Sequence, residues 1–532
     1  MSMEERFKVI SLKPNDPSSI VNLFQMCLLK RGLGYSLPRF VPLDNTIQEI
    51  LSLGAKCALW QSNVQDPDFS AEHEAYYSKW TTQVARYCTR LHFFKYDPPS
   101  DVPLEVIDAM AEQVDSYLGF VTLRPISMSP VAATILKPAQ KSTKSYLLCK
   151  DIFTVNIAGR SFEVEGTPFM QQDNAVGACA QASIWMALRT MRRKEGQAAF
   201  SPAQITTAAT RFLVMRRTLP NRGGLSLEQV SEAIRGAGYA PHTIPLRTLD
   251  EVATDDVIEK MKRSLYPYIE SGIPVLLILI PKDEDGHAVL LIGHSWNVNP
   301  SKYCSVKKFT GWKEGDEVEI IDASSWVDPL IIHNDNTGPY MELPDNVNQG
   351  YCLSQAAFAA PLLHPDIFID GNEAQEASLR LLEDSLIKFA EQIGQDDLGK
   401  IICSKLVVRT FLQDRSEFRA SVLRSDFPED IKRYYRLKWL PKRIWISELN
   451  VFDNYVNAPE SYLTRVGEVL LDPAAEAEDG AFLSIRLSQC LIPDNNFGIK
   501  GIIIDRDGLT GDIEASPVSG DIYSPLVRGH VG

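Results

Sequence analysis

One cysteine of this chain lies where a loop of small residues is followed by the pattern of an amphipathic helix. The stretch QQDNAVGACAQASIWMAL covers residues 171–188 and contains Cys179. After this cysteine, Ala182, Trp185 and Met186 recur at the three- and four-residue spacing of a helix with one buried face. The pattern predicts a helix that begins at Cys179 and packs against a hydrophobic core.

A position at the start of a helix favours the ionised form of this thiol. The unpaired N–H groups of the first helical turn carry partial positive charge, which stabilises a thiolate. We therefore expect a lowered pKa for Cys179 and interpret it as a nucleophile. The other eight cysteines are expected to be small core residues, because free cysteine is among the most buried residue types. They are Cys27, Cys57, Cys88, Cys149, Cys304, Cys352, Cys403 and Cys490.

A general base for this thiol is predicted in the stretch GIPVLLILIPKDEDGHAVLLIGHSW, residues 272–296. It contains two apolar runs typical of strands, separated by a polar turn. His287 begins the second strand, where its ring can point toward another half of the domain. His294, at the far end of the same strand, is the weaker candidate. The wide separation between Cys179 and His287 fits a nucleophile helix and a base-carrying sheet that meet at a cleft.

Further residues could complete an acyl-transfer site. Gln171 and Gln172 precede the cysteine, and either could supply a side-chain amide beside the cysteine N–H to form an oxyanion hole. Gln172 is nearer to Cys179 and is preferred. Two carboxylates at strand ends, Asp322 and Asp335, could fix the orientation and tautomer of the histidine.

Together these motifs resemble the papain-like cysteine peptidases, in particular the bacteriocin-processing and staphopain-like branch. The resemblance covers residues 165–345 and rests on a Gln before the Cys, a helix-opening Cys, and Gly-His-Ala-Val at 286–289 followed by a hydrophobic strand. The stretch 223–239 is similar to the helix that these peptidases carry between nucleophile and base. Within it, Ser226 and Gln229 have capping-box spacing. The resemblance implies an α+β papain-like core with a helical half and an antiparallel-sheet half.

The resemblance also favours one of the two carboxylates as the third member of the triad. Bacteriocin-processing peptidases carry an apolar strand followed by Asn-Asp and a Gly-containing turn, and IIHNDNTG matches this pattern at Asp335. We therefore prefer Asp335 as the third member of the triad and keep Asp322 as the alternative. The chain departs from the family in two ways. The spacing from Gln172 to Cys179 is one residue longer than usual, and Ala180 follows the cysteine in place of Gly or Trp.

The function implied by the resemblance is that of a cysteine protease. Such an enzyme would hydrolyse a peptide or isopeptide bond of a protein substrate through Cys179, His287 and Asp335, with Gln172 in the oxyanion hole. Two other functions are compatible with the same residues. An acyltransferase or transglutaminase-like enzyme would use the same triad if an amine replaced water. A degenerate papain-like core would instead act as an interaction scaffold.

Length and composition place this region inside a larger protein. The 532 residues are 45% hydrophobic and 23% charged, which is ordinary for globular proteins, and the length suggests two to four domains. We expect an N-terminal α+β accessory region at 1–150, the peptidase-like core at 151–360 and a C-terminal α+β accessory domain at 361–532. The flanking regions are expected to select the substrate or bind a protein partner.

Charge and cysteine usage argue against several other classes. A net charge of −14 disfavours a broad nucleic-acid-binding surface because it repels phosphates. The basic and aromatic segment at 432–445 is instead expected to be strand core, including Trp439, with basic residues on its exposed face. The sequence has neither CxxC pairs nor zinc-type clusters, so we expect no metal, no cofactor and a reducing cytoplasm. With no signal-peptide core and only short apolar runs, no membrane association is expected.

Hydrophobic periodicity predicts further elements in the flanking regions. We expect helices at 45–60, 70–95 and 373–393, strands at 117–126 and over 146–170 with a Gly-containing hairpin turn, and strands near 404–411, 442–449, 465–471 and 481–487. The apolar face of the predicted helix at 70–95 consists of Tyr76, Trp80, Val84, Tyr87 and Leu91.

Overall fold

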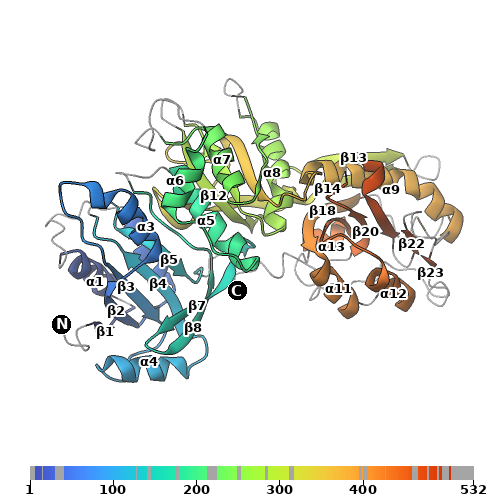
Figure 1. Ribbon diagram of the computed structural model, residues 1–532. Helices are drawn as coiled ribbons and strands as arrows, with labels where there is room; N and C mark the ends of the chain where they lie inside the picture. Colours follow the sequence, from blue (N-terminus) through green and yellow to red (C-terminus); the bar gives the residue numbers. More distant parts are fainter. Residues whose placement is uncertain are drawn as a thin grey trace.

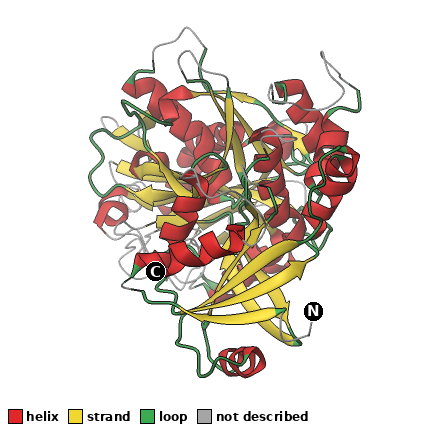
Figure 2. Ribbon diagram, turned by 90° about the vertical axis from the view of Figure 1, so that its left-hand side faces the viewer, coloured by secondary structure: helices red, strands yellow, loops and turns green. Residues whose placement is uncertain are grey.

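The computed structural model confirms the α+β class, with helices packed on antiparallel and mixed sheets (Figures 1 and 2). It describes residues 6–14, 16–29, 41–126, 129–139, 145–173, 179–212, 224–248, 253–281, 286–310, 317–394, 398, 405–425, 427–457, 465–475, 478–487, 490–493 and 503–504. Within these ranges, three large sheets follow one another along the molecule, and residues 151–166 form a separate two-stranded hairpin.

The first sheet is antiparallel, with its strands in the order of the sequence. The strands are β1 (Phe7–Ser11), β2 (Cys57–Val64), β3 (Cys88–Phe94), β4 (Tyr117–Leu123) and β5 (Val131–Leu136). The helices are α1 (Pro17–Leu29), α2 (Val41–Ser52), α3 (Pro67–Ala75) and α4 (Pro103–Ala111). Side chains alternate across the sheet: Ala58 and Trp60 share a core with α1 and α2, whereas Cys57 and Leu59 share one with α4.

Two helices predicted in this region are wrong over much of their length. The helix predicted at 45–60 ends at Ser52, and β2 follows. The helix predicted at 70–95 ends at Ala75, and β3 begins at Cys88. Trp80 and Tyr87 of its supposed apolar face are 46% and 48% exposed. The residues of the predicted apolar face do not belong to one helix, because Trp80 and Tyr87 lie between α3 and β3 and Leu91 lies in β3. Pairing with β2 and β4 makes β3 a strand.

The hairpin predicted before the nucleophile is confirmed. It consists of β7 (Asp151–Ile157) and β8 (Arg160–Gly166), paired in an unbroken antiparallel register. The turn residues Ala158 and Gly159 have φ values of 45° and 90°. The inner side chains of the hairpin, Val155 and Phe162 among them, pack in the same core as α4. The hairpin therefore covers the outer face of the first sheet (Figure 1).

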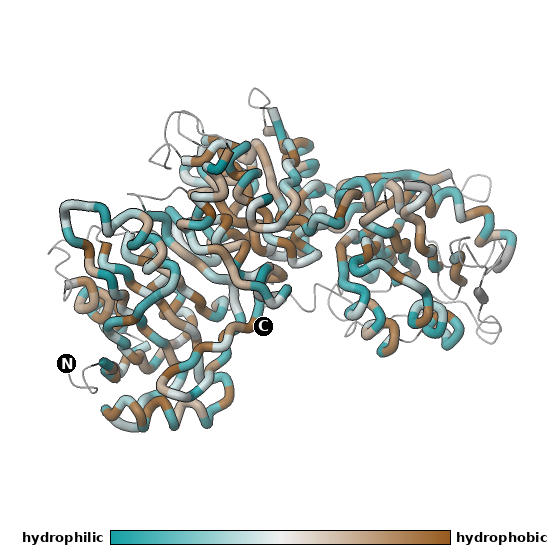
Figure 3. The backbone as a smooth tube through the Cα atoms, in the orientation of Figure 1, coloured by the Kyte–Doolittle hydropathy of each residue, from teal (hydrophilic) through white to brown (hydrophobic). Residues whose placement is uncertain are grey.

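The second sheet carries the predicted peptidase region. Its strands run in the order β10 (Ile244–Pro245), β17 (Ala356–Leu363), β11 (Val275–Leu279), β12 (His287–Trp296), β15 (Val327–Asn334) and β16 (Gly338–Leu343). Two short strands, β6 (Ser145–Leu147) and β9 (Ala240–Pro241), pair with β12 and β17. Strands β11 and β12 are almost entirely buried. Hydrophobic, brown segments gather in the interior of the second-sheet region in Figure 3.

Helices cover both faces of this second sheet. They are α5 (Cys179–Lys194), α6 (Pro202–Ala209), α7 (Leu227–Gly236) and α8 (Asp255–Glu270). Buried residues of α5 share a core with Leu290, whereas those of α8 share a core with Val289, so the two helices lie on opposite faces. The predicted capping box is confirmed at α7, where Ser226 and Gln229 bond each other's backbone N–H groups.

The third sheet is formed mainly by the C-terminal region. Its strands run in the order β13 (Ser305–Thr310), β14 (Glu317–Asp322), β18 (Lys405–Asp414), β19 (Arg443–Val451), β20 (Arg465–Leu471), β21 (Phe482–Leu487), β22 (Cys490–Pro493) and β23 (Ile503–Ile504). Its helices are α9 (Gly371–Ile393), α11 (Arg415–Arg424), α12 (Glu429–Leu437), α13 (Phe452–Asn457) and α14 (Glu478–Ala481). The predicted helix at 373–393 and the four predicted strands are confirmed, with shifts at their ends.

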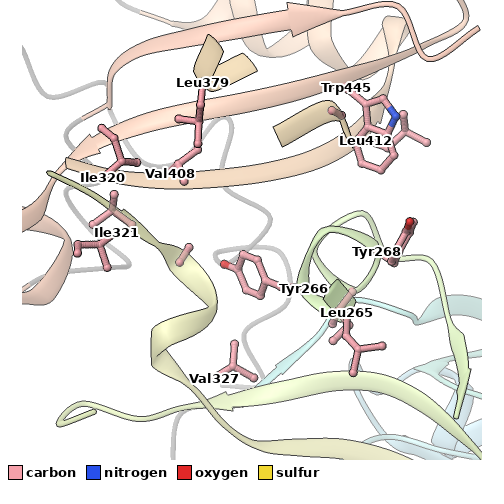
Figure 4. Close-up of a cluster of buried hydrophobic side chains, with 14 of the residues drawn as sticks. Leu265, Tyr266, Tyr268, Ile320, Ile321, Val327, Leu379, Val408, Leu412 and Trp445 are labelled. Atoms are coloured by element: carbon pink, nitrogen blue, oxygen red, sulfur yellow. The ribbon is translucent and has the colours of Figure 1, made fainter. Parts of the chain in front are cut away.

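The predicted boundary at residue 360 does not coincide with the sheets. Strands β13 and β14 lie before it, yet β14 pairs in parallel with β18 of the third sheet. One hydrophobic core joins Tyr266 of α8 to Ile320 of β14, Val408 of β18 and Trp445 of β19 (Figure 4). The second and third sheets therefore share a core instead of forming separate ones.

The basic and aromatic segment at 432–445 differs in part from its prediction. Ile444 and Trp445 are buried in β19, as expected. The earlier part of the segment is helical and belongs to α12, and Trp439 is 59% exposed. Trp439 lies in the connection between α12 and β19, and strand alternation does not apply there.

Candidate active site

Cys179 is the first residue of α5, as predicted, and its thiol touches the strand that carries His287. The backbone N–H of Ala288 donates a hydrogen bond to Cys179 Sγ at 3.3 Å. One turn further along α5, the Ser183 hydroxyl donates to the Ala288 carbonyl at 3.2 Å. These bonds hold the start of α5 against the start of β12. Residues 174–178, immediately before the cysteine, lie outside the described residues.

His287 begins β12, as predicted, and its ring is held by an asparagine. His287 Nε2 lies 2.9 Å from Oδ1 of Asn334, the last residue of β15. The same Asn334 Oδ1 accepts the backbone N–H of Asn336 at 2.9 Å, which identifies this atom as the amide oxygen. The Asn334 amide oxygen has no proton and can only accept, so His287 Nε2 must be the donor and carries the imidazole proton. Nδ1 of a neutral ring then has the lone pair of a general base.

The preferred third member, Asp335, lies beside this hydrogen bond instead of making it. Asp335 Oδ1 is 3.7 Å from His287 Nε2, beyond hydrogen-bonding distance. The carboxyl is fully buried, and neither oxygen accepts a hydrogen bond from another described residue. Asn334, directly before it at the strand end, takes the orienting position that the sequence analysis gave to Asp335.

The alternative third member, Asp322, lies away from His287. It caps the short helix Ala323–Trp326, where its carboxylate accepts the N–H of Ser324 at 2.8 Å. Its other oxygen accepts from Gln375 of α9 at 2.6 Å. Asp322 is therefore part of the packing between α9 and the third sheet.

The structure separates the roles of the two glutamines. The Gln172 side chain reaches toward the site, where Nε2 donates to Asn336 Oδ1 at 3.1 Å. Asn336 Nδ2 in turn lies 3.5 Å from His287 Nδ1. Gln171 is buried, and its side-chain oxygen accepts the N–H of Val131 at 3.3 Å. Of the two candidates, only Gln172 is thus linked to the histidine.

Tyr351 is a site residue that the sequence analysis missed. Its ring stacks on the imidazole of His287, with centroids 4.7 Å apart and planes inclined by 27°. It precedes a short helix, Leu353–Gln355, which is followed by strand β17. No local pattern marks Tyr351, because its approach to His287 depends on the path of the chain between β16 and β17. Asn334 could have been found, since it ends the same apolar run that pointed to Asp335.

Burial dominates the electrostatics of the site. The pKa of the Cys179 thiol is raised to about 11 by loss of solvation and by the nearby Asp335 carboxylate. Hydrogen bonds from the N–H groups of Ala288, Ala180 and Cys179 itself lower this pKa but do not offset the burial. The expectation of a lowered pKa is therefore wrong for this structure.

The other two titratable groups are also shifted toward their neutral forms. Burial lowers the pKa of His287, against the hydrogen bond to Asn334, which raises it. Burial raises the pKa of Asp335 to about 8. At neutral pH the resting site therefore holds a thiol, a neutral imidazole and a protonated carboxyl group.

The remaining histidine and cysteine candidates have structural roles or lie outside the described residues. His294 is buried and bonds Glu270 of α8 through Nε2 at 2.9 Å. Six of the other cysteines are buried, Cys304 is half-buried, and Cys403 lies outside the described residues. Among the residues that the structure describes, no group of three or more His, Cys, Asp or Glu side chains is arranged to hold a metal ion. No helix in the described ranges is long and apolar enough to cross a bilayer.

No protein-family model matches this sequence, and no curated protein matches it significantly. A function for the chain therefore rests on the geometry around Cys179 and His287. In this geometry the helix-opening thiol bonds the N–H of the residue after His287, and both the His287 ring and the Gln172 amide bond residues at the end of β15.

Proposed function

We propose that this chain is a cysteine hydrolase of the papain-like type that cleaves a peptide or isopeptide bond in a protein substrate. The observation that carries the proposal is the hydrogen bond from His287 Nε2 to Asn334, which leaves Nδ1 as the basic nitrogen. The residue after His287 touches the thiol of Cys179. A helix that begins at the cysteine and packs on an antiparallel sheet that carries the histidine supports the papain-like comparison.

The proposed reaction begins with proton transfer from Cys179 to His287. His287 Nδ1 takes the thiol proton as the sulfur attacks the carbonyl carbon, and Asn334 holds the ring as it becomes charged. The Cys179 N–H and the Gln172 amide stabilise the oxyanion. His287 then donates its proton to the leaving amine as the C–N bond breaks. Finally, water gives a proton to His287 and attacks the thioester, which releases the acid and restores the thiol.

The pKa shifts support a role for His287 as a general base in the proposed reaction. With the thiol pKa raised to about 11 and the imidazole pKa lowered, the resting pair is neutral at neutral pH. Proton transfer therefore accompanies the attack on the carbonyl instead of preceding substrate binding. The reaction resembles that of a serine hydrolase in this respect.

Peptide cleavage by matched variants tests the proposal. The wild-type chain is incubated with peptides from a digested proteome, and new termini are identified by mass spectrometry. We expect cleavage by wild type and by Cys490→Ala, a buried cysteine of β22 in the third sheet, and none by Cys179→Ala. Asn334→Ala should be slower by at least about tenfold, because a misoriented base loses part of the roughly 10²- to 10⁴-fold that it contributes. Cleavage that survives in Cys179→Ala, or no cleavage by wild type, would contradict the proposal.

A further inference from the structure

The two neighbours of Gln172 in the sequence are both held by the N-terminal region. The N–H of Gln171 donates to the Val131 carbonyl at 3.1 Å, and its side chain accepts the Val131 N–H. On the other side of Gln172, the buried carboxylate of Asp173 accepts a hydrogen bond from the Tyr77 hydroxyl. Both partners belong to the first sheet or its adjoining helices, far from the catalytic residues in the sequence.

A buried arginine of the first sheet adds a third contact. Arg124 follows β4, is 1% exposed, and donates through Nη2 to the Gln171 carbonyl at 2.7 Å. Its Nε donates to the Ser129 carbonyl at 2.6 Å, and its Nη1 lies 3.4 Å from Glu72 of α3. Arg124 therefore joins the backbone before Gln172 to two other parts of the N-terminal region.

The same region also contacts the chain on either side of this segment. Before it, Phe169 exchanges two backbone hydrogen bonds with Thr134 of β5, at 2.8 and 2.9 Å. After it, Arg189 of the nucleophile helix α5 forms an ion pair with Asp68 of α3. The N-terminal region thus fixes both the approach to Gln172 and the helix that begins at Cys179.

Gln172 differs from its neighbours in the direction of its side chain. Gln171 and Asp173 are bonded to the N-terminal region, whereas the Gln172 amide bonds Asn336 beside the catalytic histidine. An oxyanion donor must lie within a few tenths of an ångström of its working position. A side chain on an unsupported loop is not held that closely. Here the contacts of Gln171 and Asp173, on either side of Gln172, fix its position.

We propose that Tyr77 and Arg124 are positioning residues for Gln172, and that the first sheet is a necessary part of the catalytic site. The N-terminal region then acts on the reaction itself, in addition to the substrate selection expected of an accessory region. This inference rests on the proposed function, in which Gln172 stabilises the oxyanion. It concerns contacts that the proposed function does not use.

A pair of tyrosine variants tests the inference. Tyr77→Phe removes the hydroxyl that holds Asp173. Tyr117→Phe is the matched control, because Tyr117 is equally buried in the same region and its hydroxyl bonds His92 Nδ1 at 2.8 Å. Two probes are used with the full-length chain. Iodoacetamide reads the reactivity of the Cys179 thiol, and the tripeptide aldehyde acetyl-leucyl-leucyl-norleucinal reads the oxyanion hole, because its hemithioacetal oxygen occupies that position.

We expect Tyr77→Phe to weaken aldehyde inhibition by about tenfold, as a part of the roughly 10²- to 10³-fold that a lost oxyanion donor costs. The iodoacetamide rate at Cys179 should stay at the wild-type value, and Tyr117→Phe should change neither readout. Asp173→Asn keeps an oxygen that can accept from Tyr77, and it should retain most of the aldehyde affinity. Thermal melts by circular dichroism establish that each variant is folded.

The outcomes separate this inference from the proposed function. Aldehyde affinity that is unchanged in Tyr77→Phe, or lost equally in Tyr117→Phe, would overturn the positioning role. A wild-type chain whose Cys179 reacts with iodoacetamide but binds no aldehyde would overturn it as well. If the reaction of Cys179 does not depend on His287, tested with His287→Ala, the proposed function itself fails.

Discussion

Asp335 is the residue whose environment most affects the chemistry of the candidate site. It is fully buried, lies 3.7 Å from the His287 ring and raises the pKa of the Cys179 thiol. Its own pKa is raised to about 8 by burial. Below that pH the carboxyl is protonated and does not oppose a thiolate. Above it, the negative charge disfavours ionisation of Cys179.

Asp335→Asn should therefore make Cys179 more reactive at alkaline pH. Between about pH 8 and 11 the variant lacks the negative charge that opposes the thiolate, so the thiol pKa should fall and alkylation by iodoacetamide should accelerate. At pH 6 to 7, roughly, the wild-type carboxyl is neutral and the two rates should be similar. The measurement is the alkylation rate of Cys179 against pH by mass spectrometry.

Asn334→Asp is the control for the position of the charge. It introduces a carboxylate at the neighbouring residue, where the His287 ring is hydrogen-bonded. A carboxylate that accepts from His287 Nε2 should stabilise the imidazolium and raise the pKa of His287. Superimposable pH profiles for wild type and Asp335→Asn would show that the buried carboxyl does not control the thiol.

At the scale of the elements, the β7–β8 hairpin has a strained turn. Ala158 and Gly159 connect the strands, with φ values of 45° and 90°. A two-residue hairpin turn with both φ values positive suits Asn-Gly best, because a Cβ is unfavourable in the left-handed conformation and Asn tolerates it better than Ala. The chain therefore carries conformational strain at Ala158.

Ala158→Asn should raise the free energy of unfolding by about 0.5–1 kcal/mol, since it relieves part of the roughly 1–2 kcal/mol penalty of a left-handed residue with a Cβ. Urea denaturation followed by circular dichroism measures the change. Gly159→Ala is the matched control. A Cβ added there meets no atom within 4 Å, so any loss of stability reports the backbone conformation alone. A stabilised Gly159→Ala variant would contradict this account of the turn.

At the scale of the whole molecule, the second and third sheets depend on each other. Strand β14 leaves the second-sheet region and pairs with β18, and α8 packs in the same core as β18 and β19. Leu412 of β18 also donates its N–H to the Ser271 hydroxyl at 2.7 Å, at the end of α8. Part of the apolar surface of the candidate catalytic region is thus covered by the C-terminal region.

A fragment of residues 1–370, which ends after β17 and before α9, should consequently fail to fold as a stable unit. It keeps β13 and β14 but lacks β18, which leaves Ile320 and Ile321 without their partners Leu406 and Val407. We expect aggregation or a loss of cooperative melting, measured by size-exclusion chromatography and circular dichroism. Co-expression with residues 371–532 should restore a folded complex. A monomeric 1–370 fragment with a cooperative thermal transition like that of the full chain would contradict this prediction.

Several features of the protein were determined by short stretches of sequence alone. The helix start at Cys179, the strand start at His287 and the capping box of Ser226 and Gln229 appear where the local patterns predicted them. Each depends on residues within a few positions, on helical or strand periodicity, and on backbone groups that a neighbouring side chain satisfies. Such information is present in any short window of the chain.

Other features were decided only by the tertiary structure. Asn334 and not Asp335 bonds His287 because of the way two distant strands meet, and burial by several elements reverses the expected pKa shift of Cys179. The segment from 88 to 94 is a strand because β2 and β4 pair with it, although Leu91 continues the helical spacing of the apolar residues before it. Hydrogen-bond partners and desolvation depend on contacts between residues far apart in the chain, and local periodicity contains no record of those contacts.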